Sequence, residues 1–351
     1  MPDAEQTAIV HEQTAQLHAK HRHLGHDQVI SFYPPRMRAQ AHLFGVAYTH
    51  VDGTRWNFGD WDYPFPLQSI AKVFIHALAL QDNGREGTLR HVGVEPSGDP
   101  FYEITFDETN NRPFNPMINA GALVTTSLIH GDTRDEKVAR LLQMLRTFSG
   151  NHRLQVDEET LARELESNDR NLALSYLMRS LGMLTGDVYD NLVVYLSACS
   201  VKVTGRELAD MGATLANGGV HPVTGQRALP RALVRDVATV MLMCGMYTAA
   251  GQWAYDVGIP AKSGVSGGLL VVLPNRFGAG FFSPGLDRHG NSVRAVNMCR
   301  DLSNRLGLHV FADSADTTFG RREPVDADQA LRREPTSAGE GAPRSPRRQR
   351  S

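Results

Sequence analysis

The stretch Pro64-Phe65-Pro66-Leu67-Gln68-Ser69-Ile70-Ala71-Lys72 contains a Ser-x-x-Lys and opens an apolar run that reaches Leu80. Two prolines precede the run and Asn83-Gly84 follows it, which predicts a helix that ends there. The helix is apolar on nearly every side, so we expect it to be buried. Residues three apart lie on one helical face, so Ser69 and Lys72 should lie within reach of each other.

A serine at the start of a buried helix has the surroundings of a nucleophile. Free backbone N–H groups and the positive end of the helix dipole favour negative charge near Ser69. Lys72, on a buried helix, would be a base that replaces the usual histidine. The alternative is a capping serine followed by a solvated lysine, and the motif taken alone fits that interpretation as well.

Composition restricts the class of protein. The chain has 351 residues, of which 41% are hydrophobic, and its net charge is -2, so neither nucleic acid nor an anionic membrane is an expected partner. No apolar run is long enough to span a bilayer, and the N-terminus does not resemble a signal peptide. The three cysteines are far apart, which predicts neither a disulfide framework nor a zinc site. We therefore expect a cytoplasmic protein.

The order of expected elements predicts an α/β fold with three regions. Strands are expected at 43–49, 55–58, 260–273 and 277–283, with helices between them. This order indicates an antiparallel sheet closed by both ends of the chain and flanked by helices, with an inserted all-helical subdomain. We expect an N-terminal helical segment at 1–27 and a catalytic domain at 28–312. Its sheet parts are about 28–66 and 255–312, and its helical part is about 67–254.

The remaining residues, 313–351, are rich in arginine and proline and poor in large apolar side chains. Such a composition cannot bury a core, so this tail is predicted to be disordered.

A second motif, Lys262-Ser263-Gly264, comes about 190 residues after Ser69. It resembles the Lys-Thr/Ser-Gly element that penicillin-recognising enzymes carry on a strand beside the nucleophile. Such a strand could direct the Val265 N–H at an oxyanion, with the Ser69 N–H as the second donor. A strand start with a solvated lysine is the alternative for the tripeptide alone.

Six segments in order give the chain a family resemblance. They are Phe65–Lys72, Glu95–Gly98, Asn115–Ala122, Asp169–Asn171, Cys244–Tyr247 and Lys262–Val265. Together they resemble the bacterial glutaminases, a serine-dependent family with a β-lactamase-like fold, over residues 28–310. The resemblance implies hydrolysis of L-glutamine to L-glutamate and ammonia, and a homodimer or homotetramer. It implies neither a metal nor another cofactor.

The resemblance also implies roles for individual residues. Ser69 would be the nucleophile and Lys72 its partner, with Tyr195 and Tyr33 assisting catalysis. Whether Lys72 or Tyr195 is the general base stays open. The implied substrate contacts are Ser69, Asn119, Glu164, Asn171, Tyr195, Tyr247 and Val265. Glu164 is assigned by its spacing to Asn171, and Glu158, Glu159 and Glu166 are its local competitors.

The chemistry of free glutamine agrees with these residues. Its ammonium needs an anion, which Glu164 can supply. Its carboxylate needs donors, which Asn119, Asn171 and tyrosine hydroxyls can supply. Two rival functions remain: a β-lactam-recognising enzyme of the same fold, and a glutamine-binding sensor without turnover.

Overall fold

The computed structural model describes residues 4–24 and 40–312. Tyr33 and the tail at 313–351, both named from the sequence, lie outside the described residues. The predicted boundaries of the N-terminal segment, the catalytic domain and the tail therefore stay predictions.

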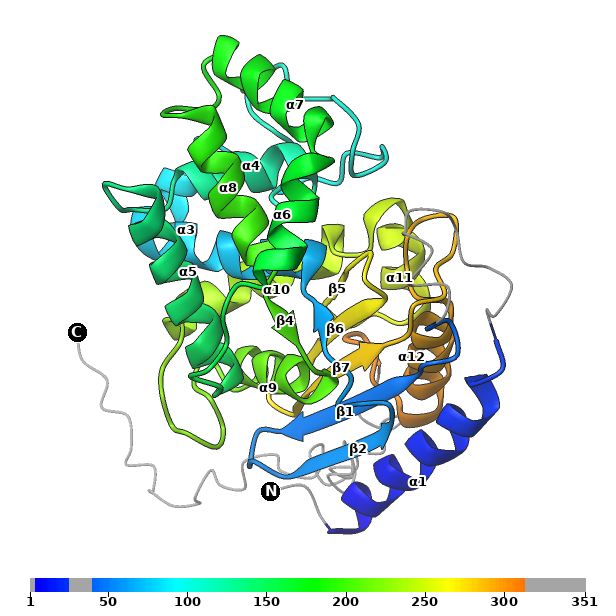
Figure 1. The fold of residues 1–351 in the computed structure, drawn as a ribbon. Helices are drawn as coiled ribbons and strands as arrows, with labels where there is room; N and C mark the ends of the chain where they lie inside the picture. The colour runs from blue at the N-terminus through cyan, green and yellow to red at the C-terminus, as the bar shows by residue number, and fades with distance from the viewer. Residues whose placement is uncertain (1–3, 25–39, 313–351) are drawn as a thin grey trace, which may run out of the picture.

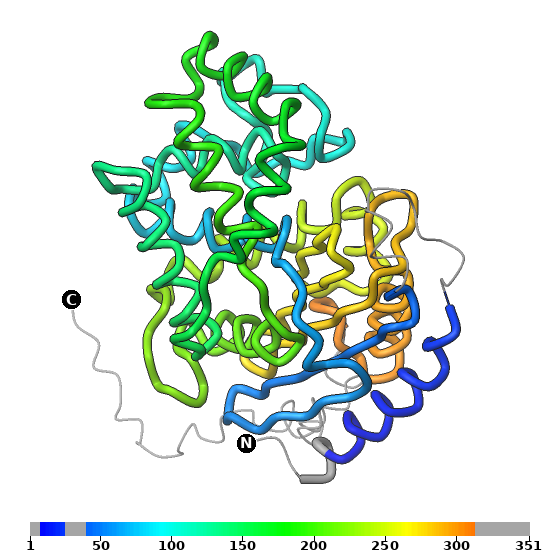
Figure 2. Tube along the Cα trace, in the orientation of Figure 1, coloured from blue at the N-terminus to red at the C-terminus, as the bar shows by residue number. Residues whose placement is uncertain are grey.

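A five-stranded antiparallel sheet joins the two ends of the described chain (Figures 1 and 2). Its order is β2-β1-β7-β6-β5, and β1 pairs with β7 along its whole length. The strands are β1 (Gly45–His50), β2 (Arg55–Gly59), β5 (Ala261–Ser263), β6 (Gly268–Leu273) and β7 (Phe277–Phe282). The predicted α/β architecture is confirmed.

Strand β7 shows how the sequence assigns the two faces of the sheet. Phe277, Ala279 and Phe281 point to one face, while Gly278 and Gly280 alternate with them. Helix α9 (Gly205–Ala216) packs on the glycine face, where a Cβ on Gly278 would lie 2.0 Å from the Ala213 nitrogen. The glycines therefore permit a close approach of helix to strand.

Three helices cover the bulky face of the sheet: α1 (Ala4–His21), α11 (Ala250–Asp256) and α12 (Val293–Leu306). Val10 and Leu17 of α1 belong to the same apolar cluster as Leu269, Phe281 and the buried side of α12. The N-terminal helix is thus part of the core around the sheet.

The helical part lies beyond α9 and surrounds the buried helix α3 (Ala71–Leu89), as Figure 1 shows. Its other helices are α4 (Asn119–Ser127), α5 (Arg134–Ser149), α6 (Glu158–Glu166), α7 (Asp169–Ser180), α8 (Val188–Cys199) and α10 (Arg231–Cys244). A short two-stranded pairing of β3 (Phe65–Pro66) with β4 (Lys202–Val203) connects the start of α3 to the end of α8.

Two expected elements differ from the structure. The single strand expected at 260–273 is wrong: it is a hairpin of β5 and β6, because Gly267 takes a φ of 90° and turns the chain. Helix α3, which the sequence predicts to end at Asn83-Gly84, does not end there. It kinks at Gly84, with φ 67° and ψ 173°, and continues to Leu89.

Among the described residues, no single helix is long and apolar enough to cross a membrane. One pair, Arg231–Cys244 with Tyr247–Asp256, meets that criterion only when the two are taken together across a 93° bend.

Arg294 on α12 is fully buried and connects the N-terminal part to the core. Its guanidinium donates from Nε to the Leu24 carbonyl at 2.7 Å and from Nη1 to the Leu43 carbonyl at 2.9 Å. Further bonds reach the carbonyls of Ala41 and His42. A planar guanidinium is suited to such a set, since it carries five fixed donors.

Replacing Arg294 by Met should therefore destabilise the protein strongly. Four carbonyls would lose their donor, which is itself fully buried, at a total cost of roughly 2–4 kcal/mol. We expect the melting temperature to fall by roughly 3–7 °C in a thermal scan. Arg300→Met is the matched control on the same helix, because the Arg300 side chain is 39% exposed and pairs with Asp256 near the surface. Equal shifts for the two variants would contradict the role given to Arg294.

Candidate active site

Ser69 lies on a sharp turn between β3 and α3. It is 7% exposed and belongs to a 3-10 turn, Gln68–Ile70, that leads directly into α3. Gln68, just before it, has a φ of 50°, which few residues other than glycine adopt. Strained backbone of this kind is concentrated at functional sites. The backbone conformation of this turn thus singles out the predicted nucleophile.

Lys72 is fully buried one turn further along the same helix. Its Nζ donates to Asn119 Oδ1 at 2.6 Å and to the Met117 carbonyl at 3.3 Å, and it lies 5.7 Å from the centre of the Phe101 ring. No ion pair of Lys72 with a carboxylate is present in the described part of the chain. Burial lowers the pKa of Lys72 to about 7, so a large fraction is neutral near pH 7 and able to accept a proton.

Two tyrosines lie beside the nucleophile, with different partners. The Tyr247 side chain lies close enough to the Ser69 hydroxyl for the two to interact, and the Tyr247 hydroxyl donates to the Ser263 carbonyl at 2.9 Å. The Tyr195 side chain instead lies beside the Cys199 thiol one helical turn away and interacts with it. Burial raises the pKa of both tyrosines, so both are neutral. In this arrangement Tyr247, rather than Tyr195, contacts the nucleophile.

Tyr247 has an unusual backbone conformation, and Lys262 lies over its ring. Its φ is 55°, and the Lys262 Nζ lies 4.1 Å from the centre of its ring. Lys262 is fully buried and donates to the carbonyls of Gly245 and Ser263 at 3.0 and 2.7 Å. Burial and then the charge of Lys72 lower the pKa of Lys262. The Lys-Ser-Gly element therefore lies beside the nucleophile, with its lysine turned into the core.

Val265 lies in the turn between β5 and β6, where the sequence placed an oxyanion donor. Its backbone N–H makes no backbone hydrogen bond in the described part of the chain, whereas the neighbouring Gly264 and Gly267 N–H groups both do. A donor left free in this way is what an oxyanion site requires.

Glu164 and Asn171 come from two different helices, α6 and α7, that meet at the site. Glu164 Oε1 accepts from Gln68 Nε2 at 2.7 Å, which ties it to the residue before the nucleophile. Asn171 Oδ1 accepts from Asn119 Nδ2 at 3.0 Å, and Asn119 in turn accepts from Lys72. The structure thus brings together all the predicted site residues it describes. Tyr33 is not among the described residues.

Sequence reasoning missed Gln68 and Phe101. Gln68 gave no signal, because its positive φ and its bond to Glu164 are visible only in three dimensions. Phe101 lies in the long loop between α3 and α4, and its ring packs against that of Tyr247 at an angle of 38°, with centroids 4.5 Å apart. The length of that loop was a functional signal that could have directed attention to it.

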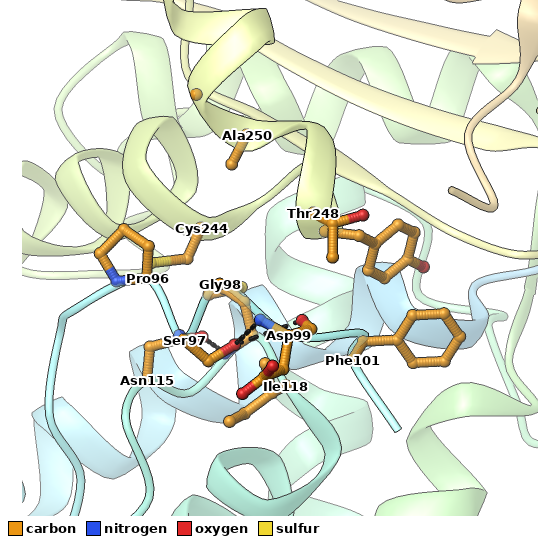
Figure 3. A pocket seen from close by; sticks show the side chains of 13 residues that line it. Pro96, Ser97, Gly98, Asp99, Phe101, Asn115, Ile118, Cys244, Thr248 and Ala250 are labelled. Atoms are coloured by element: carbon orange, nitrogen blue, oxygen red, sulfur yellow. Dashed lines mark hydrogen bonds between the residues drawn. The ribbon is translucent and has the colours of Figure 1, made fainter. Parts of the chain in front are cut away.

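A cavity of about 200 Å³ adjoins this cluster (Figure 3). Phe101, Met117 and Tyr247 line it, as do the loop around Ser97 and the start of α11. Ser69 and Lys72 are not part of the lining, so the cavity shares only the aromatic wall and Met117 with the site. No group of three or more His, Cys, Asp or Glu side chains suited to a metal is found among the described residues.

The antiparallel sheet flanked by helices defines a class, the proteins of β-lactamase-like fold. Comparisons with known proteins identify the family within this class. The sequence profile of the glutaminase family matches residues 28–311. A glutaminase of Trichormus variabilis is 46% identical over 295 residues, which cover 84% of this chain and 88% of that protein.

Solved structures agree with this. One described as "Probable glutaminase ybaS" superposes with a TM-score of 0.83 at 36% identity and covers 88% of this chain and 99% of its own. "Mglu in its glutamate form" has a TM-score of 0.80 at 42% identity and covers 86% of this chain and 69% of its own. The chain belongs to the glutaminase family, whose members are hydrolases of the glutamine amide bond.

Proposed function

We propose that this glutaminase hydrolyses L-glutamine through a γ-glutamyl ester on Ser69. The observation that supports this most is the buried Lys72, whose pKa of about 7 makes it a competent base one turn from Ser69. Ser69 Oγ forms a bond to the side-chain amide carbon of glutamine. The C–N bond then breaks, and the nitrogen leaves as ammonia with the proton that Ser69 gave up.

Lys72 takes that proton, either directly or through a tyrosine hydroxyl. The contact of Ser69 with Tyr247 makes Tyr247 the better candidate for such a relay. The N–H groups of Ser69 and Val265 stabilise the oxyanion in both steps. Water, activated by the same neutral lysine, then hydrolyses the ester and releases L-glutamate.

The two rival functions have less support. A β-lactam-recognising enzyme would use the lysine of Lys262-Ser263-Gly264 towards a ligand carboxylate, but Lys262 is fully buried and donates to two backbone carbonyls. A sensor without turnover would not need a lysine whose pKa is lowered beside a serine. An ammonia-release assay with L-glutamine, run beside nitrocefin hydrolysis, tests the proposal. Nitrocefin turnover without ammonia release would overturn it.

Glu164→Gln should weaken the binding of glutamine far more than it slows the chemistry. A carboxylate that contacts the ammonium, remote from the reacting amide, acts alike in the ground state and the transition state, so its loss raises KM. A charge-assisted hydrogen bond is worth roughly 1.5–3 kcal/mol, or roughly 10- to 100-fold in KM. The measurement compares glutamine with its des-amino analogue for the parent and the variant.

Glu166→Gln is the matched control for this experiment, because Glu166 is exposed and lies on the same helix. The des-amino analogue should lose little further activity with Glu164→Gln, since it has no ammonium to bind. If glutamine and the analogue lose equally, Glu164 does not contact the ammonium.

We further propose that the protein acts in the cytoplasm as a homodimer or homotetramer. The family resemblance supports the oligomer, and the widely spaced, buried cysteines are consistent with a reducing compartment. Light scattering coupled to size-exclusion chromatography measures the oligomeric state, and cell fractionation measures the location.

A further inference from the structure

Helix α7, which carries Asn171, lacks the side-chain cap that five other described helices have. Five helices start at a residue in extended conformation, with ψ between 104° and 169°, whose side chain accepts a hydrogen bond from the backbone. These capping residues are Thr133, Asp157, Asp187, Thr204 and Ser292. At the start of α7, Asn168 has φ −111° and ψ 24°, and its side chain makes no capping bond, although Asn is among the best capping residues.

The Asn168 side chain instead contacts the two helices that form the substrate site. Its Oδ1 accepts from Asn171 Nδ2, and its Nδ2 donates to the Glu164 carbonyl at 2.8 Å. Asn168 is only 9% exposed, so water competes little for these bonds. Asn168 therefore occupies a capping position, but its side chain connects α6 to α7 instead of capping α7.

These bonds extend into a chain of side-chain amides whose direction is fixed from both ends. When Lys72 is protonated, its ammonium can only donate, so Asn119 presents its oxygen to Lys72 and its nitrogen to Asn171. When Lys72 is neutral, the carbonyl at the other end of the chain sets the same direction. The Glu164 carbonyl can only accept, so Asn168 must present its nitrogen there and its oxygen to Asn171. The Lys72 ammonium and the Glu164 carbonyl thus require the same orientation of the three amides between them.

The orientation has a consequence for the ligand. The oxygens of Asn119 and Asn171 are both occupied within the chain, while each nitrogen uses one of its two N–H groups there. Each amide therefore keeps one N–H for an external acceptor and turns its oxygen away from it. A carboxylate is the acceptor suited to such donors, because amide oxygens facing it would repel it.

We propose that Asn168 is a positioning residue that holds the Asn171 and Asn119 amides with their N–H groups towards the α-carboxylate of the substrate. This inference rests on the proposed substrate site. Without Asn168, the Asn171 amide loses the acceptor of its nitrogen and is free to rotate its oxygen towards the carboxylate.

The test is Asn168→Ala, assayed by ammonia release from L-glutamine and from 4-aminobutanamide, which lacks the α-carboxylate. We expect kcat/KM for glutamine to fall about tenfold, mainly through KM, while kcat/KM for 4-aminobutanamide stays within about twofold. Asn217→Ala is the matched control. Asn217 also lies at a helix end and donates to a backbone carbonyl, that of Val220 at 2.9 Å, but contacts no site residue in the described part. Both variants should lower the melting temperature by a few degrees, and only Asn168→Ala should discriminate between the substrates.

An equal fall for both substrates, or the same discrimination by Asn217→Ala, would overturn the inference. A double cycle with Asn171→Ala separates it from the proposed site. If Asn171→Ala leaves glutamine turnover unchanged, the proposed site is wrong. If Asn171→Ala lowers turnover and Asn168→Ala does not, only the role of Asn168 is wrong. If both single variants lower glutamine turnover, the double variant should have the same turnover as Asn171→Ala alone.

Discussion

Ser69→Ala is expected to abolish ammonia release from glutamine, with a loss of at least about 10⁴-fold in kcat. No γ-glutamyl ester can form without the hydroxyl, and the environment of the site is shaped around that group: Ser69 is nearly buried and follows a strained residue. The fold should survive, because Ala fits the same turn and only the contact to Tyr247 is lost.

Ser303→Ala is the control for this variant. Ser303 is also buried and donates to the Val257 carbonyl at 2.7 Å, but it lies on α12. It should retain full activity. Rapid acid quench of the parent enzyme with glutamine should yield a glutamyl adduct on the peptide that contains Ser69. Ammonia release by folded Ser69→Ala protein at a rate near that of the parent would exclude the covalent route.

Lys72→Met is expected to lower kcat by roughly 10²–10⁴-fold, which is what a general base contributes. For the parent enzyme, kcat/KM should rise with pH through about 7, because Lys72 must lose its proton to act as a base. The residual activity of Lys72→Met should lack that dependence. Lys137→Met is the control: Lys137 is partly buried and donates to the Ser127 carbonyl, far from Ser69 in the sequence. An unchanged pH profile in Lys72→Met would assign the base to another group.

Lys72→Met should also be more stable than the parent at neutral pH. The pKa of Lys72 is about 7 in the folded protein and near its ordinary value of 10.5 in the unfolded chain. Between these two values the unfolded state binds a proton that the folded state does not, so the stability due to this group rises with pH across that window. Methionine removes this penalty. A higher melting temperature at pH 7, with activity lost, would show that the buried lysine is kept for chemistry.

Much of the fold was predictable, because local patterns carried it. The apolar run after Ser69 predicted a buried helix, and the two strands near each end predicted a sheet closed by both. The hairpin within 260–273 was missed because a run of small and apolar residues fits one long strand as well as two. Only the positive φ of Gly267 distinguishes them.

The candidate site was predictable as a set of residues but not as a network. Family resemblance supplied the residues, since Asn119, Glu164 and Asn171 carry no individual signal. The hydrogen bond of Gln68 to Glu164 and the contact of Ser69 with Tyr247 join positions far apart in the chain. Such contacts depend on how helices pack, which no local pattern encodes. The sequence named Tyr195 as a possible relay and Tyr247 as a substrate contact, and the contact of Ser69 with Tyr247 makes Tyr247 a further candidate for the relay.

The pairing of β1 with β7 also sets the order in which a newly synthesised chain can mature. Strand β1 ends at His50 and its partner begins at Phe277, so more than 200 residues leave the ribosome between them. At roughly 5–20 residues per second this interval lasts roughly 10–40 s. During it the apolar helix that bears Ser69 has neither its oxyanion strand nor its sheet. The apolar helix therefore stays without its packing partners in the sheet until β5 to β7 have been made, and the site cannot form before Phe282 has left the ribosome.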